Sequence, residues 1–150
     1  LDPDNASVLA TEISERLNLD AVALMSEGQK SIYRKRLTKY RERLSLAQHD
    51  AYSHFTNAFE LRPFLTIRDS AGQTRGVASH YKIREKAKLD SPACILVEPN
   101  YHKKEATILS AELGVPIRMI DPEGRSVELG PNAYTDFFKA FVMQYESCFS

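Results

Sequence analysis

The sequence predicts an α/β domain in which a parallel sheet is flanked by helices, with a long helix at the start. From residue 64 onwards, short apolar segments alternate with segments of helical length, and this alternation favours strands joined by right-handed crossovers. Residues 93–97 form an unbroken apolar run, Ala-Cys-Ile-Leu-Val, which is typical of a strand buried on both faces of a parallel sheet. The length of 150 residues suits a single domain of this class.

Two helices are predicted in the first third of the chain. Asp4 or Asn5 can cap the first helix, whose apolar side follows a helical spacing and consists of Leu9, Ile13 and Leu17. The second helix begins near Glu27 and is predicted to run straight into His49, with no strand between them. Its apolar stripe follows steps of four and three residues and consists of Tyr33, Leu37, Tyr40, Leu44 and Ala47.

The remaining elements alternate along the chain. A short helix after His49 carries Tyr52, Phe55 and Phe59 on one side. Strands are predicted at 64–67, 93–97 and 116–120, a turn at 69–72, and helices at 77–89, 103–113 and 132–148. Gly114 is expected to end the helix that precedes it. The last helix has an aromatic stripe formed by Tyr134, Phe138, Phe141 and Tyr145.

The composition excludes several classes of protein. Twenty Lys and Arg balance 20 Asp and Glu, and 43% of residues are hydrophobic, so neither a disordered chain nor a broadly basic nucleic-acid binder is indicated. No run approaches the 18 apolar residues of a membrane span. The one basic cluster is interpreted as a solvated helix face rather than a nucleic-acid site, and it consists of Lys30, Arg34, Lys35, Arg36, Lys39, Arg41 and Arg43.

The two cysteines, Cys94 and Cys148, are 54 positions apart in the sequence. This spacing matches neither a zinc finger nor a redox pair. Two interpretations stay open at this point: two small buried hydrophobic residues, or one long-range disulfide formed in an oxidising compartment.

His49 and Asp121 are the candidate functional residues. The sequence contains no Gly-rich phosphate loop, no nucleophile elbow and no HExxH motif. Asp121 comes just after a predicted strand, where α/β sheets bind ligands. It could ligate a metal, act as a base, or accept hydrogen bonds from a turn, and on the residue alone the turn role is favoured. His49 is placed at the start of a helix, while His54, His80 and His102 are interpreted as surface residues.

Four segments of the chain occur in an order that resembles a known family. They are Ala-Cys-Ile-Leu-Val-Glu-Pro-Asn at 93–100, Gly-Val-Pro-Ile-Arg-Met-Ile-Asp-Pro-Glu-Gly at 114–124, Glu-Leu-Gly-Pro-Asn-Ala-Tyr at 128–134 and Gln-Tyr-Glu-Ser-Cys-Phe at 144–149. The string resembles the carboxyl-terminal lobe of periplasmic zinc-uptake solute-binding proteins of the ZnuA type. His49-Asp50-Ala51-Tyr52 resembles the family's metal-binding His-Asp-Ala-Tyr segment, and Leu1-Asp2-Pro3 resembles the residues that open its interlobe helix.

This resemblance implies a function and a set of site residues. It implies a disulfide between Cys94 and Cys148, His49 as a metal ligand, and Asp121 at the position of an acidic ligand in manganese-type relatives. Imidazole nitrogen suits zinc better than manganese, so the implied cargo is Zn²⁺, captured in the periplasm and delivered to the membrane permease of an ABC transporter. The intact protein would be a monomer with no enzymatic activity and no nucleic-acid partner.

The resemblance also predicts how the chain is divided. Residues 1–48 correspond to the interlobe and following helices, and residues 49–150 correspond to the carboxyl-terminal α/β lobe. The family's amino-terminal lobe, with two ligand histidines, and its His-rich loop have no counterpart in the sequence, and Glu123 stands where the family has a hydrophobic residue. The family has an apolar strand before its His-Asp-Ala-Tyr segment, so the sheet is expected to lack one strand.

Two rival functions are weighed against zinc capture. The first is an orphan α/β interaction domain with a vestigial metal site. The second is an enzyme that uses Asp121 and His49 as an acid–base pair. The enzyme ranks last because the sequence supplies no nucleophile or cofactor loop for it.

Overall fold

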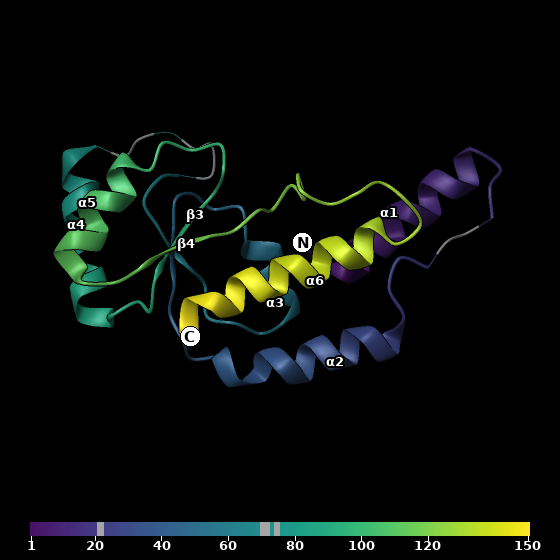
Figure 1. The fold of residues 1–150 in the computed structure, drawn as a ribbon, viewed down its shortest axis with the longest axis horizontal. Helices are drawn as coiled ribbons and strands as arrows, with labels where there is room; N and C mark the ends of the chain where they lie inside the picture. Colours follow the sequence, from purple (N-terminus) through teal and green to yellow (C-terminus); the bar gives the residue numbers. More distant parts are fainter. Residues whose placement is uncertain (21–22, 70–72, 74–75) are drawn as a thin grey trace.

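The computed structural model describes residues 1–20, 23–69, 73 and 76–150, and their fold is a four-stranded parallel sheet flanked by helices (Figure 1). The predicted fold class is confirmed. The strands are β1 (Leu46–Ala47), β2 (Leu65–Thr66), β3 (Ile95–Val97) and β4 (Ile117–Met119). The helices are α1 (Pro3–Arg16), α2 (Glu27–Leu37), α3 (Ser53–Ala58), α4 (Val77–Asp90), α5 (Lys104–Leu113) and α6 (Ala133–Glu146). The predicted turn at 69–72 falls largely outside the described residues.

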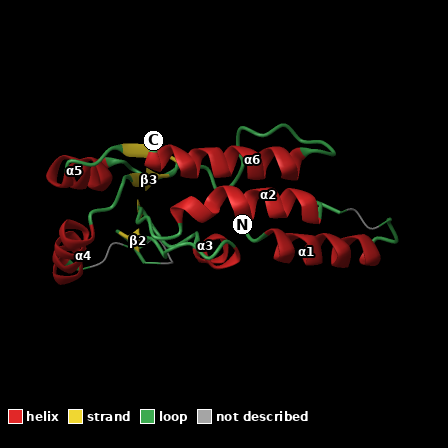
Figure 2. Ribbon diagram, turned by 90° about the horizontal axis from the view of Figure 1, so that it is seen from below, coloured by secondary structure: helices red, strands yellow, loops and turns green. Residues whose placement is uncertain are grey.

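The sheet has the strand order β2-β1-β3-β4, and it separates two hydrophobic clusters. Alternate residues of a strand point to opposite faces, so Leu46, Ile95 and Val97 pack with residues of α4 and α5. Ala47 and Leu96 instead pack with residues of α2, α3 and α6. Strand β3 is fully buried on both sides, as its unbroken apolar sequence predicted. Helices α1, α2 and α6 extend away from the sheet on the same side (Figure 2).

The predicted second helix is wrong in its second half. Helix α2 begins after the Ser26 cap but ends at Leu37, and only a short 3-10 turn follows it. Leu46 and Ala47 form strand β1, so the strand that seemed to be missing before His49 is present and occupies an inner position in the sheet. The step from Leu44 to Ala47 imitates helical spacing, but pairing with two neighbouring strands buries both β1 side chains completely.

Helix α1 differs from the prediction at its cap and on its apolar side. The Asp2 side chain, rather than that of Asp4 or Asn5, accepts hydrogen bonds from the first backbone N–H groups. Leu9 is 61% exposed, Ile13 49% and Leu17 62%, so the apolar side of α1 faces solvent in this structure. The helix is joined to α2 by an ion pair between Asp4 and Lys30. Lys30 is therefore buried and does not belong to a solvated basic face.

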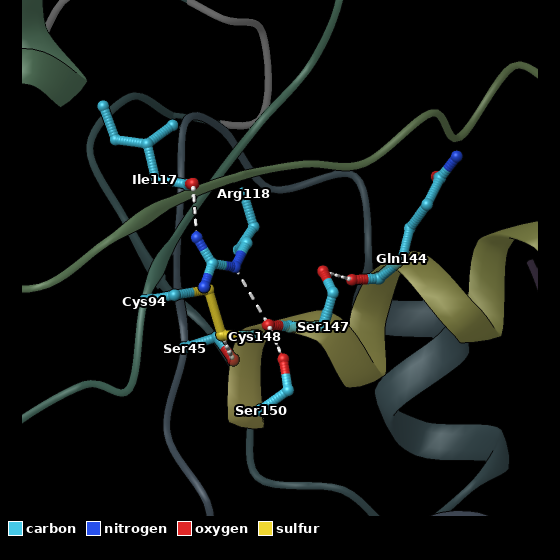
Figure 3. Close-up of a disulfide and its surroundings, with 8 residues drawn as sticks. All are labelled: Ser45, Cys94, Ile117, Arg118, Gln144, Ser147, Cys148 and Ser150. Atoms are coloured by element: carbon cyan, nitrogen blue, oxygen red, sulfur yellow. Dashed lines mark hydrogen bonds between the residues drawn. A yellow bond between two sulfur atoms is a disulfide. The ribbon is translucent and has the colours of Figure 1, made fainter.

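Helix α6 closes the core over the sheet. Phe138, Phe141 and Tyr145 are buried as their spacing predicted, and the rings of Phe55 and Phe141 lie 5.0 Å apart in an edge-to-face arrangement that favours aromatic pairs. The predicted disulfide between Cys94 and Cys148 is confirmed, with a Cα–Cα distance of 5.3 Å (Figure 3). It links the residue before β3 to the chain just after α6.

A second contact reinforces this link. The Arg118 side chain donates a hydrogen bond to the carbonyl oxygen of Ser147 at 3.0 Å, and the Ser45 hydroxyl lies 3.3 Å from Cys148 Sγ (Figure 3). The end of the chain is thus fixed to the sheet at several neighbouring points.

None of the helices in the described part of the chain is long and apolar enough to cross a membrane.

Replacing both cysteines by serine is expected to lower the free energy of unfolding by up to about 4 kcal/mol, since the disulfide closes a loop of 54 residues in the unfolded chain. Urea denaturation of the double variant and of the wild-type protein would measure this difference. Wild-type protein treated with a reductant is the matched control and should lose the same stability. An unfolding free energy equal to that of the oxidised wild type would contradict the prediction.

Candidate metal centre

The candidate site lies at the edge of the sheet where the strands end. From β1 the chain passes through α3 to β2 on one side, and then through α4 to β3 on the other side of β1. The strand order therefore reverses between β1 and β3, and open α/β sheets bind ligands in the crevice at such a point. His49 follows β1 by two residues and Glu98 follows β3 directly. The fold thus brings these two side chains to the predicted binding edge.

The His49 imidazole lies against the Glu98 carboxylate. Its Nε2 atom is 2.9 Å from Glu98 Oε1, and the two side chains are only 13% and 6% exposed. Both ring nitrogens are buried, yet neither makes an aligned hydrogen bond to any described residue, and Nε2 approaches the carboxylate without N–H alignment. Tyr101 covers the ring at a centroid distance of 4.8 Å. Buried nitrogens without partners are unusual in proteins, and they leave His49 able to bind an ion.

The sequence placed His49 at the start of a helix, but the structure does not. It lies in the connection between β1 and α3, which starts at Ser53. The pairing of β1 on both sides fixes the place of this connection, and the adjacent Gln48 side chain donates a hydrogen bond to the His102 carbonyl at 3.1 Å. The sheet rather than a helix terminus therefore positions the histidine.

Glu98 is held by hydrogen bonds from two directions. The Tyr52 hydroxyl donates to Glu98 Oε1 at 2.7 Å, and the Glu98 backbone N–H donates to Gln48 Oε1 at 3.0 Å. Burial, together with the bond to Glu98, raises the pKa of Tyr52 well above its usual range, so this hydroxyl stays a donor. Within the described residues, His49 is the one group able to carry positive charge that lies within ion-pair distance of the Glu98 carboxylate.

Asp121 lies at the same edge but is engaged in a turn. Its Oδ1 accepts the N–H groups of Glu123 and Gly124 at 3.0 and 3.1 Å, and its Oδ2 accepts that of Arg125 at 2.7 Å. Gly124 has φ +67°, and a Cβ there would lie 2.8 Å from the Phe137 ring, so the turn is packed tightly on α6. This is the turn role that the sequence favoured for Asp121 alone.

Strand order separates Asp121 from His49. Asp121 follows β4 and His49 follows β1, with β3 between them. Strands are spaced by about 4.8 Å, so the ends of β1 and β4 are about 10 Å apart, and Glu98 occupies the intervening strand end. The structure therefore gives His49 a nearer carboxylate than the one that the sequence singled out.

The described residues do not form a complete metal-binding cluster. Among them, no three side chains of His, Cys, Asp or Glu converge in a way that could hold an ion. His54 and His102 are exposed and His80 is half-buried, in keeping with the surface roles predicted for them. Glu98 is not among the residues that the sequence predicted for the site. Its place directly after the buried strand was the available signal, but the strand before His49 was not predicted.

Comparisons with known proteins find relatives along nearly the whole chain, although no family model matches it. High-affinity zinc uptake system protein ZnuA of Haemophilus ducreyi is 23% identical over 97% of this chain and 51% of its own length. The protein of the same name from Paracoccus denitrificans is 27% identical over 98% of this chain and 44% of its own. The chain spans about half the length of these curated relatives.

Solved structures with the same fold come from similar proteins. A crystal structure of ZnuA covers 100% of this chain with a TM-score of 0.73 at 16% identity, and this chain covers 60% of it. The laminin-binding protein Lmb of Streptococcus agalactiae, described as having adhesin and metal transporting activity, has a TM-score of 0.79 at 19% identity, over 98% of this chain and 62% of its own. The predicted resemblance to the carboxyl-terminal lobe of ZnuA-type proteins is confirmed.

Changing Asp121 to alanine is expected to lower the free energy of unfolding by about 1–3 kcal/mol, because three backbone N–H groups lose their acceptor. Asp121→Asn should cost less, since the amide oxygen still accepts. Chemical denaturation of the two variants would measure the difference. Wild-type stability in Asp121→Ala would show that the turn does not depend on this carboxylate.

Proposed function

We propose that this chain is the carboxyl-terminal lobe and interlobe helix of a periplasmic protein that captures zinc and delivers it to the permease of an ABC transporter. The observation that carries the proposal is the buried imidazole of His49, whose nitrogens make no aligned hydrogen bond to the described residues, at the point where the strand order reverses. The match to proteins named for high-affinity zinc uptake, over nearly all of this chain, supports it. These relatives are named for uptake and not for catalysis, and the proposal includes no enzymatic step.

The chemistry of His49 suits zinc as cargo. A neutral imidazole nitrogen is a preferred zinc ligand, and manganese favours carboxylate oxygen instead. Asp121 would contribute less than His49, because its oxygens already accept three backbone hydrogen bonds. We propose it as a weaker contributor at the same edge of the sheet.

The remaining ligands would come from a second lobe. A tight zinc site fills four coordination positions, and the described residues do not supply them. The solvent-facing side of α1, formed by Val8, Leu9, Ile13 and Leu17, offers an apolar surface that such a lobe could cover. Dividing the ligands between two lobes would allow their movement to weaken the site and release the ion.

The predicted division assigned residues 1–48 to interlobe and following helices and residues 49–150 to the carboxyl-terminal lobe, and we propose that the lobe also includes the strand just before this boundary. Strand β1, at residues 46–47, pairs within the sheet of that lobe. The interlobe role therefore rests on α1 and α2. The intact protein is expected to be a monomer.

In the intact protein, His49→Ala is expected to weaken zinc binding by orders of magnitude, because it removes a direct ligand. Asp121→Ala should weaken binding less. Isothermal calorimetric titration with zinc would give both affinities. His54→Ala is a suitable control, since it removes an exposed histidine from α3 without touching the site. Zinc affinity equal to that of wild type in the His49 variant would eliminate the proposed function and favour an interaction domain with a vestigial metal site.

Residues 1–150 alone are expected to bind zinc only weakly, because His49 and Asp121 can fill at most two of the four positions of a tetrahedral site. Water would occupy the rest. Competition against a chromogenic zinc chelator would measure the affinity. Binding in the nanomolar range by this chain alone would mean that other side chains complete the site, and the two-lobe proposal would then be abandoned.

A further inference from the structure

We propose that Glu98 is the positioning residue of the zinc-binding histidine. Its carboxylate accepts a hydrogen bond from the ring nitrogen of His49 that carries the proton, and the other ring nitrogen is left free to bind the metal. The inference rests on the proposed function and names a residue through which the site works. It is carried by the approach of Glu98 Oε1 to His49 Nε2, at 2.9 Å, within a buried pair.

Burial makes this pairing energetically significant. The Glu98 side chain is only 6% exposed, and within the described residues no Lys or Arg lies within ion-pair distance of it. Tyr52 supplies a neutral donor to this carboxylate, but a buried charge without a positive partner is still costly. An imidazole N–H becomes a better donor when its other nitrogen binds a cation, so the attraction between Glu98 and His49 would strengthen as zinc binds. Carboxylates paired in this way with metal-binding histidines fix the tautomer and the ring orientation.

The surroundings hold Glu98 still while His49 can adjust. Tyr52 and Gln48 fix the carboxylate and the backbone of Glu98, so the acceptor is already in place. The His49 N–H is within reach of it but not aligned. The torsion that turns an imidazole ring is soft, and hydrogen bonds at functional sites are often poorly aligned before the ligand binds. A small rotation of the ring would complete the bond.

Asp121 is poorly placed to accept a hydrogen bond from the His49 ring. Both of its oxygens are directed at backbone N–H groups of the turn that follows it, and β3 lies between β4 and β1. Glu98, at the end of β3, stands beside His49. The carboxylate that orients the histidine is therefore Glu98.

The test is the variant Glu98→Gln in the intact protein. The amide keeps the size of the side chain and can accept from Tyr52, but it can turn either its oxygen or its NH₂ group toward the imidazole. Zinc affinity, measured by calorimetry, is expected to fall about 10–100-fold, as for other outer partners of metal ligands. Glu123→Gln is the matched control, because Glu123 is an exposed acid at the same edge of the sheet, and it should leave the affinity unchanged.

Two further measurements separate positioning from a general structural effect. Nitrogen-15 NMR of the zinc-free protein should show one dominant neutral tautomer of His49, and Glu98→Gln should raise the population of the other. In a double-mutant cycle, Glu98→Gln should cause no further loss of zinc affinity when His49 is already alanine. A fall in stability alone would produce neither result.

Several outcomes would overturn the inference. The first three are wild-type zinc affinity in Glu98→Gln, an unchanged His49 tautomer in that variant, and an equal loss of zinc affinity with and without His49. The fourth is that X-ray absorption of zinc-loaded Glu98→Gln shows one oxygen neighbour of zinc fewer than wild type, which would make Glu98 a direct ligand. If His49→Ala itself binds zinc as well as wild type, the proposed function fails. If only Glu98→Gln is without effect, the function stands and the positioning role is withdrawn.

Discussion

The pairing of Leu46 and Ala47 with strands on both sides is the constraint on which the rest of the structure depends. The Leu46 N–H donates to the Cys94 carbonyl at 3.1 Å, and the Ile67 N–H donates to the Ala47 carbonyl at 3.0 Å, so these two residues join β3 to β2. Their side chains point to opposite faces and enter the two hydrophobic clusters. Strand β1 ends at Ala47. His49, two residues later, therefore lies where the strand order reverses between β1 and β3.

The same edge of the sheet concentrates the polar chemistry of the lobe. A buried carboxylate, a buried imidazole and a buried tyrosine hydroxyl meet there, and the Gln48 side chain links the backbone of Glu98 to that of His102. In a low-dielectric setting each of these groups is costly without a partner. The network satisfies Glu98 and Tyr52 but leaves the His49 nitrogens open.

Stability and function are divided between different parts of the molecule. The aromatic side chains of α3 and α6 and the disulfide fix the closing helix to the sheet, so the lobe has a rigid core beneath the site. Helix α1 is attached mainly at its start, through Asp4 and Lys30, and its apolar side remains in solvent. The exposed apolar side of α1 therefore lies outside the core that stabilises the sheet.

The sequence by itself determined the elements whose signal is local. The unbroken run at 93–97 indicated the doubly buried strand, and the spacing of Phe138, Phe141 and Tyr145 indicated the closing helix. The ordered segments after residue 93 indicated the resemblance to ZnuA-type proteins and the disulfide that it implies. Tertiary structure alone decided the rest. A two-residue strand is too short for periodicity to distinguish it from a helix end, and only pairing with distant strands makes β1. The partnership of His49 with Glu98 likewise joins the ends of two different strands, and no local pattern encodes which strands will be neighbours.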